Sequence, residues 1–354
     1  MKSIIHWKTI VFLLSFLTFG HLLNYFFIPY SDKSSFIWAN LSEKKIPKSE
    51  IDILILGDSQ VLSGVMPLEL QTEFRNKKIF YYPRPSEQPE GIYYFLLTNV
   101  FNDNLKPKLI IWNLSLIGLT KSGIVEAHRK LFKDRVDFNF VVYTDPFLSS
   151  FYLKGFIGGL EYTISKLLAY PIVSSQLTTE FSLIPRSLNM NLQSNQLENF
   201  TLHNPFKSLL INYERNQFIL KNMNENLGYY DWTLDENLEK SSCFQKQTDV
   251  SSYHFNLAFN QSREKAFEVW EKIIFNLIQK NIAFKILLIP FHPELKGKTE
   301  NFILSTFKKN YDYKNFWEIS NLTEEDYGDY IHPNSCGAKK ITKFLIEKLN
   351  EINF

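Results

Sequence analysis

Short, nearly continuous runs of apolar residues alternate along the chain with segments whose apolar residues recur every three or four positions. The runs are rich in Ile, Leu and aromatic residues and cover 51–56, 78–82, 109–113 and 284–289. Runs of this length and composition are typical of strands that are buried on both faces of a parallel sheet. We therefore predict four strands of an open, mostly parallel sheet.

Segments with helical periodicity accompany these runs. They cover 91–101, 263–280 and 337–349, and in the second of them Phe267, Trp270 and further apolar residues follow each other at spacings of three and four. Regular alternation of strands and helices is typical of α/β folds, in which helices cover both faces of the sheet. The pattern predicts a three-layer α/β domain.

The most apolar part of the chain lies near its beginning, at residues 9–30. This length is enough to cross a hydrocarbon core of about 30 Å as a helix. A cleaved signal peptide and a buried core helix are the alternatives, but the stretch exceeds the usual h-region and no small-x-small cleavage pattern follows it. We predict an uncleaved signal anchor, with residues 1–8 in the cytoplasm, 31–49 as a linker and 50–354 exported to the periplasmic or extracytoplasmic face of the inner membrane.

The rhythm of strands and helices is interrupted between residues 120 and 260. This part is rich in Asn, Ser, Phe and Tyr and contains several amphipathic stretches, but no convincing parallel strand. We interpret it as a mainly helical insertion into the sheet domain. No repeat of 20 to 50 residues is visible, so a solenoid is not expected.

Charge and cysteine content narrow the range of functions. Lys and Arg total 39 against 37 Asp and Glu, and a net charge of +2 gives no reason to expect a nucleic-acid partner. The two cysteines, Cys243 and Cys336, have no Cys or His neighbour at metal-ligand spacing, so no structural metal site is predicted. In an exported protein they could form one disulfide, but this requires a Cα separation below about 7 Å that a sequence does not reveal.

Two polar motifs stand where the predicted sheet would place a site. Gly57-Asp-Ser-Gln60 directly follows the first strand, and open α/β sheets bind ligands at the carboxyl ends of their strands. The triplet alone is weak, because a plain strand-ending turn is the alternative. The second motif, Gly328-Asp-Tyr-Ile-His-Pro-Asn-Ser-Cys-Gly337, opens the last helix. Its Asp329 and His332 are three residues apart, so the carboxylate can orient the imidazole and leave Nε2 free as a base.

Together the two motifs resemble the first and last signature blocks of the SGNH (GDSL-type) hydrolase superfamily, in the same order along the chain. The resemblance covers about 51–115 and 283–354 and implies a flavodoxin-like, three-layer sheet. It also implies that Ser59 is the nucleophile, His332 the general base and acid, and Asp329 the orienting carboxylate. This chemistry needs no metal or organic cofactor.

In that superfamily three groups hold the oxyanion: the N–H of the nucleophile, a glycine after the second strand and an asparagine after the third. The resemblance assigns the first of them to Ser59. Gly91 is the nearest glycine, although it is displaced from the usual position, and Asn113 ends the third strand. Ser115 is the alternative to Asn113, because the usual Gly-x-Asn-Asp motif is absent.

Further candidates for binding the oxyanion or the substrate surround these positions. Asp58 and Gln60 flank the proposed nucleophile, and His292 follows the fourth strand, where an ordinary histidine in a Pro-bounded turn is the alternative. Arg84 and Gln88 follow the second strand. We interpret these last two as part of an exposed, solvated loop rather than of a cleft.

The departures from the usual oxyanion motifs resemble divergent, membrane-tethered proteins of bacterial envelope polysaccharide O-acetylation, and also uncharacterised exported families that share a Gly-Asp-Ser-Gln block. This resemblance implies a serine esterase or O-acyltransferase that acts on acylated carbohydrate, often beside a membrane-embedded acyl carrier. The alternative is a non-catalytic envelope protein that binds glycan or a membrane partner in the same cleft. A Ser59 Oγ within about 3.2 Å of His332 Nε2 would favour catalysis, whereas splayed side chains would favour binding.

Overall fold

The computed structural model describes four long segments and a few short pieces before residue 50. The long segments, which omit a few single positions, are 50–114, 205–231, 264–293 and 315–354. The chain divides into two compact units, one made of Met1–Ser42 and Phe132–Ile219 and the other of Glu43–Leu131 and Leu220–Phe354. The second unit contains the predicted strands and both polar motifs.

The core of the second unit is a five-stranded sheet in which all neighbouring strands run parallel. The strands are β1 (Glu50–Gly57), β2 (Ile79–Pro83), β3 (Lys106–Asn113), β4 (Ala283–Leu288) and β5 (Phe316–Glu318). Their order, β2-β1-β3-β4-β5, is that of flavodoxin-like doubly wound sheets. The prediction of an open, parallel sheet is confirmed, and β5 is an additional strand that is too short to produce a pattern of its own.

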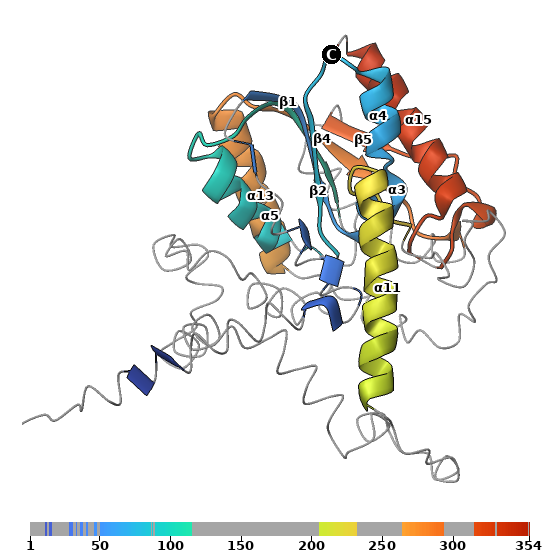
Figure 1. Cartoon of the computed structure of the whole chain (residues 1–354). Coiled ribbons are helices and arrows are strands. Elements are labelled where there is room, and N and C mark those ends of the chain that lie inside the picture. Colours follow the sequence, from blue (N-terminus) through green and yellow to red (C-terminus); the bar gives the residue numbers. More distant parts are fainter. Residues whose placement is uncertain are drawn as a thin grey trace, which may run out of the picture. The chain divides into compact units, whose positions relative to one another are not determined.

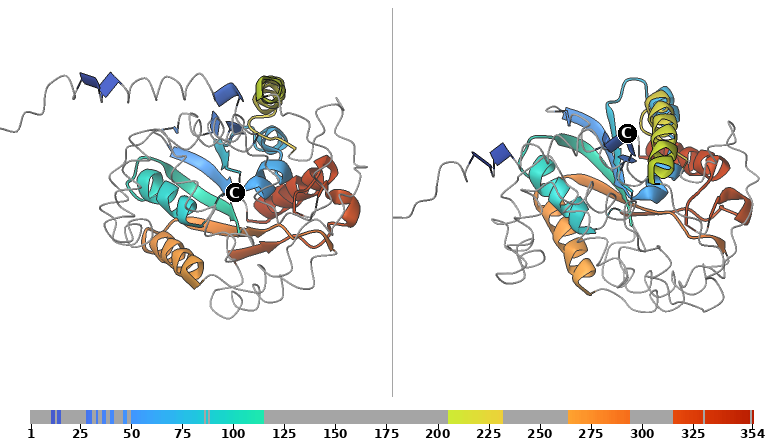
Figure 2. Two further views of the ribbon diagram at one scale, coloured as in Figure 1. Left: turned by 90° about the horizontal axis from the view of Figure 1, so that it is seen from below. Right: turned by 60° about the horizontal axis from the view of Figure 1, so that its bottom comes forward.

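Helices cover both faces of this sheet, as the alternation of strands and helices predicts. They are α3 (Ser59–Gly64), α4 (Pro67–Glu73), α5 (Pro89–Phe95) with its π-helical continuation η2 (Leu96–Val100), α13 (Glu264–Gln279) and α15 (Ser335–Glu351). Figures 1 and 2 show α5 and α13 on one face and α3, α4 and α15 on the other. The three-layer α/β architecture is therefore present.

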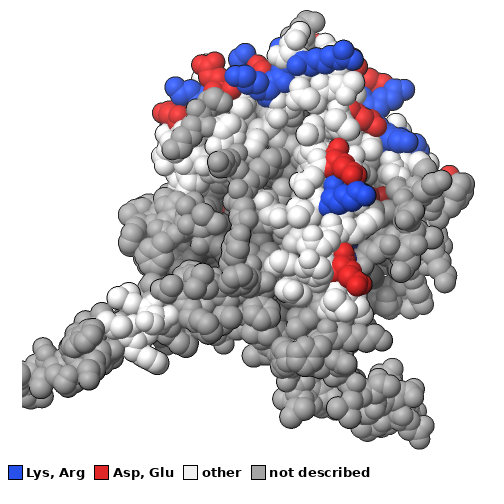
Figure 3. All heavy atoms as spheres, in the orientation of Figure 1, with Lys and Arg blue, Asp and Glu red and all other residues white. Residues whose placement is uncertain are grey.

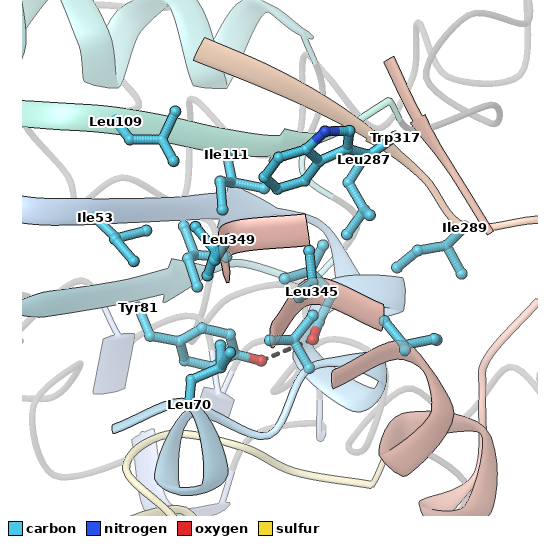
Figure 4. Packing of buried hydrophobic residues seen from close by; sticks show 14 of the residues in the cluster. Ile53, Leu70, Tyr81, Leu109, Ile111, Leu287, Ile289, Trp317, Leu345 and Leu349 are labelled. Atoms are coloured by element: carbon cyan, nitrogen blue, oxygen red, sulfur yellow. Dashed lines mark hydrogen bonds between the residues drawn. The ribbon is translucent and has the colours of Figure 1, made fainter. Parts of the chain in front are cut away.

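The two faces of the sheet are packed differently. Alternate residues of the central strands, such as Ile53, Ile111 and Leu287, point toward α3, α4 and α15 and form one apolar cluster with Leu345 and its neighbours on α15 (Figure 4). On the opposite face, the ring of Trp112 stacks on that of Trp270 in α13 at a centroid distance of 4.9 Å. Since both faces are buried, the strands appear in sequence as nearly continuous apolar runs.

Charged side chains gather at the edge of the sheet where the strands begin. Asp52 of β1 accepts hydrogen bonds from the backbone N–H of Lys78 and from Nζ of Lys108, so it links β1 to the chain entering β2 and to β3. On the face shown in Figure 3, Lys, Arg, Asp and Glu side chains lie side by side over this end of the domain. Positively and negatively charged side chains are mixed on the described surface there.

The first unit is described in part. It contains the short turn η1 (Ile28–Tyr30) and the beginning of α11 (Pro205–Glu225), and Asn212 and Asn216 of α11 donate to the backbone carbonyls of Tyr30 and Pro29. Helix α11 falls within the predicted insertion, most of which lies outside the described residues. No helix in the described part of the chain is both long and apolar enough to cross a bilayer. Most of the predicted anchor, 9–30, also lies outside that part.

Cys336, at the beginning of α15, is disulfide-bonded. The only other cysteine in the chain is Cys243, which is therefore its partner within this chain and lies outside the described residues. The disulfide that the sequence leaves open is thus present.

Truncating the apolar face of α15 should weaken the domain markedly. Leu345 is completely buried, and Leu345→Ala should lower the free energy of unfolding by about 2–5 kcal/mol because it leaves a cavity between helix and sheet. Lys343→Ala, on the exposed side of the same helix, should change it by less than about 0.5 kcal/mol. Urea unfolding of the two variants measures the difference, and equal effects would contradict the packing described above.

Reduction of the disulfide should also destabilise the protein. Closing the loop between Cys243 and Cys336 restricts the unfolded chain, so reduction should cost about 2–5 kcal/mol. Thermal unfolding with and without dithiothreitol measures the effect, and in Cys336→Ser the reductant should make no difference. Two free thiols in the denatured, unreduced protein would show that the bond does not form.

Candidate active site

The serine of the first motif sits at a sharp turn from strand to helix. β1 ends at Gly57, Asp58 is the N-cap of α3 and Ser59 is the first residue of that helix. The Asp58 carboxylate accepts the N–H of Gln60 at 2.9 Å, which fixes the start of the helix. A Cβ at Gly57 would overlap the side chain of Val61, so the close return of the helix onto the strand requires glycine at this position.

The second motif forms a tight loop before α15. Tyr327 and Pro333 make an isolated antiparallel bridge, and the N–H of Gly328 donates to the carbonyl of His332 at 3.1 Å. The loop closed by these contacts carries both Asp329 and His332. The two side chains therefore lie on one short, internally bonded segment.

Three contacts fasten this loop to its surroundings. Asn334 caps α15 by accepting the N–H groups of Cys336 and Gly337, and its own amide donates to the carbonyl of Glu325 in η8 (Glu324–Asp326) at 2.7 Å. The hydroxyl of Tyr327 donates to the carbonyl of Pro290, just after β4, at 2.8 Å. The loop is thus fixed to α15, to η8 and to the carboxyl end of β4. Asparagine before a helix is a common N-cap, so this role of Asn334 was readable from the sequence.

The structure brings Ser59, His332 and Asp329 together in one chain of hydrogen bonds. His332 Nε2 lies 2.8 Å from Ser59 Oγ, and His332 Nδ1 lies 2.7 Å from Asp329 Oδ2. The other carboxylate oxygen of Asp329 accepts the backbone N–H groups of Ile331 and His332 at 2.8 and 2.7 Å. The carboxylate orients the imidazole, and the imidazole is directed at the hydroxyl.

Opposing influences set the charge of Asp329. Burial disfavours the ionised carboxyl, but attraction to His332, the hydrogen bond from its ring and the two backbone N–H groups outweigh burial and hold the pKa of Asp329 below its usual 3.8. The carboxylate is therefore ionised at neutral pH. An ionised Asp329 keeps the proton of a neutral imidazole on Nδ1 and leaves the Nε2 lone pair facing Ser59.

The side-chain amide of Asn113, a candidate oxyanion donor, forms hydrogen bonds with neighbouring side chains. Its Nδ2 donates to Asp58 Oδ1 at 3.0 Å and to Gln60 Oε1 at 3.3 Å, while Gln60 Nε2 donates to the carbonyl of Ile331 at 3.1 Å. Asp58, Gln60 and Asn113 are all almost completely buried. These side chains bind one another and the loop beside the imidazole. Ser115, the alternative donor, lies outside the described residues.

Gly91 lies within α5 and packs against a buried ion pair. The guanidinium of Arg84 pairs with Glu87 and donates from Nη2 to the carbonyl of Gly91 at 3.2 Å, and a Cβ at Gly91 would overlap the Glu87 carboxylate. The interpretation of Arg84 as part of an exposed loop is wrong, because only 5% of the residue is exposed. Pairing with a carboxylate makes burial of the charge possible. Gln88 lies outside the described residues.

His292 follows β4 and is buried beside the loop that carries Asp329 and His332. Its ring meets that of Tyr327 edge to face, at a centroid distance of 5.6 Å. It therefore borders the segment that carries Asp329. Among the described residues, no group of three or more His, Cys, Asp or Glu is arranged to hold a metal ion.

Comparison with known proteins does not assign this site to a family. No family model matches the sequence, and a search of curated proteins finds no match. The chemical interpretation of the site therefore depends on the arrangement of its residues and on the two motifs.

The lowered pKa of Asp329 predicts how its contribution to stability depends on pH. A carboxyl whose pKa is lower in the folded state stabilises the fold above its unfolded pKa of about 3.9, and this stability is lost as the pH falls through the folded pKa. Wild type should exceed Asp329→Asn in urea midpoint at pH 5.5, and the difference should shrink at pH 3. A difference that is the same at both pH values would contradict the lowered pKa.

Proposed function

We propose that the protein is a serine esterase or O-acyltransferase that acts on acyl esters of cell-envelope carbohydrate through an acyl-enzyme on Ser59. The supporting observation is the 2.8 Å approach of His332 Nε2 to Ser59 Oγ, with Asp329 on the other ring nitrogen. A nucleophile, a base and a group that orients the base form the arrangement that activates serine in unrelated hydrolases.

In the first half of the proposed reaction, Ser59 Oγ attacks the ester carbonyl while His332 Nε2 takes the hydroxyl proton. The imidazolium formed in this step is stabilised by the ionised Asp329 at 2.7 Å. The negative charge on the former carbonyl oxygen is held by the N–H of Ser59, at the start of α3. Collapse of the intermediate breaks the ester bond, and His332 returns the proton to the departing alcohol.

In the second half, an acceptor hydroxyl resolves the acyl-enzyme. His332 removes the proton from water or from a sugar hydroxyl, the oxygen attacks the acyl carbon, and the proton is delivered back to Ser59 Oγ. Water gives an esterase, and a sugar gives a transferase. Both outcomes use the same three residues in the same geometry.

The proposed location and substrate are supported by separate features. The disulfide at Cys336 is typical of proteins in oxidising compartments such as the periplasm. The apolar residues 9–30 support a membrane anchor. The two motifs support an SGNH-type hydrolase, and the likeness to membrane-tethered envelope acyltransferases supports an acylated carbohydrate as substrate and a membrane-embedded acyl carrier as partner.

The same geometry weighs against a purely binding role. A cleft that only held a glycan would not need an imidazole nitrogen at hydrogen-bond distance from a serine hydroxyl at the first turn of a helix. Asp329 is ionised and accepts two backbone N–H groups, and such a fixed carboxylate is the partner that a general base requires. These observations favour turnover.

Labelling of the full-length protein by a fluorophosphonate probe, together with turnover of p-nitrophenyl acetate, tests the proposal. Wild type should react, and Ser59→Ala and His332→Ala should each lower activity by about 10⁴-fold or more, because the members of a triad act as a unit. Ser320→Ala, which changes an exposed serine next to β5, should behave as wild type.

Two results would contradict the proposed function. Labelling that persists in Ser59→Ala would place the nucleophile elsewhere. A folded wild type that is neither labelled nor able to turn over the ester would argue for the binding role instead.

A further inference from the structure

Gln60 joins the two halves of the site. Its side chain is 1% exposed, and its Nε2 donates to the carbonyl of Ile331, 271 positions away and directly before His332. Its Oε1 accepts Nδ2 of Asn113 at the end of β3. One amide thus connects the residue after the nucleophile, the end of the third strand and the loop that carries the base.

The orientation of these amides is determined by their partners. The carbonyl of Ile331 can only accept, so it requires the NH₂ group of Gln60, and the oxygen of Gln60 must then face Asn113. Asp58 Oδ1 already accepts the N–H of Gln60, and as a carboxylate oxygen it also requires the NH₂ group of Asn113. A flip of either amide would set oxygen against oxygen in a buried place.

Both N–H bonds of the Asn113 amide are therefore directed into the protein. Its Oδ1 is buried and has no hydrogen-bond partner in the described part of the structure. In this state Asn113 offers no N–H to an oxyanion, in contrast to the role that the SGNH resemblance implies. Its amide instead supports Gln60 and the Asp58 cap.

We propose that Gln60 is a positioning residue that sets the distance between Ser59 and His332 by holding the base loop to the nucleophile turn. This inference rests on the proposed function, because it concerns the alignment of the same triad. Within the described part of the structure, the Gln60 side chain forms no hydrogen bond with the side chains of the triad. It acts through the backbone, because Gln60 directly follows Ser59 and its amide binds the carbonyl of Ile331, directly before His332. Displacements of about 1 Å in such sites can lower rates about 10²-fold.

The first test compares two glutamine variants in the full-length protein. Gln60→Leu keeps most of the side-chain volume but removes both amide bonds, and it should slow labelling of Ser59 by the fluorophosphonate probe about 10²-fold. Gln71→Leu is the matched control, because Gln71 also donates to two backbone carbonyls, those of Phe74 and Lys77, away from the site. The control should label at the wild-type rate. Wild-type labelling in a folded Gln60→Leu variant would overturn the proposal.

The second test uses pH and does not depend on the leucine variant folding. In Gln60→Glu the introduced carboxyl can accept from Asn113 in either state, but it can donate to the Ile331 carbonyl only when protonated. Burial and the nearby Asp58 and Asp329 carboxylates favour the protonated form, whereas a positively charged His332 would oppose it. The ratio of variant to wild-type labelling should rise at least about tenfold from pH 8 to pH 5.5. A ratio that is independent of pH would contradict the role of the Ile331 bond.

A third measurement separates this inference from the proposed function. The His332 Nδ1 proton, held between ring and carboxylate, should give a low-field proton NMR signal that needs no turnover. The signal should shift or broaden in Gln60→Leu and remain unchanged in Gln71→Leu. If the wild type is not labelled but the NMR signal changes in Gln60→Leu alone, the proposed enzymatic function is refuted and the positioning role of Gln60 is retained. An unchanged signal in Gln60→Leu would refute the positioning role.

Discussion

The packing of α15 against α3 is the contact on which the site depends. Ser59 and His332 are 273 positions apart, and they meet because both helices lie on the same face of the sheet, one beginning at the nucleophile and the other just after the base. Gly64 permits the close approach, since a Cβ there would come within 3.1 Å of the Ile341 side chain. The N–H of Met66, the N-cap of α4, donates to the hydroxyl of Thr342 in α15 at 2.9 Å and ties α15 to the segment that follows α3.

The parallel sheet supplies the second condition. All five strands end at the same edge, so the turn after β1, the end of β3 and the segment after β4 converge there. Polar side chains at this edge are buried, and burial without partners would cost about 1–3 kcal/mol for each lost hydrogen bond. Asp58, Gln60 and Asn113 bind one another at this edge, and Gln60 also binds the carbonyl of Ile331. Asn113 Oδ1 is the exception, because it is buried without a partner in the described part of the structure. A shift of the base loop would therefore break the Gln60 contact together with the Ser59–His332 contact.

Much of the fold is predictable from the sequence for a physical reason. β1, β3 and β4 are covered on both faces, so they appear as nearly continuous apolar runs, and α13 shows its buried side at helical spacing. β5 has three residues, and the six residues of α3 are buried on all sides, so neither produces a periodic pattern. The burial of Arg84 is not predictable from the sequence, because it depends on an ion pair with Glu87 that the sequence does not reveal.

In the site, too, some features are predictable from the sequence and others are not. The contacts of His332 with Ser59 and Asp329 are predictable because short motifs fix the local geometry, and two of the three residues share one loop. The orientation of the Asn113 amide could not be predicted, because it is set by Asp58 and Gln60, which lie 55 and 53 positions away. Side-chain direction at a strand end is decided by partners from other segments, and a single sequence does not report them.

In the proposed reaction, the choice between hydrolysis and transfer depends on which hydroxyl group reaches His332 after the acyl-enzyme has formed. The base is oriented identically in both cases, so the triad itself cannot favour a sugar over water. Selection must come from groups that hold an acceptor near Nε2 and keep water away. The described residues beside the base loop include His292, which packs on Tyr327 and is itself almost fully buried. A buried imidazole is poorly placed to hold an exposed sugar, so the selectivity of the proposed enzyme depends on residues other than those that form its triad.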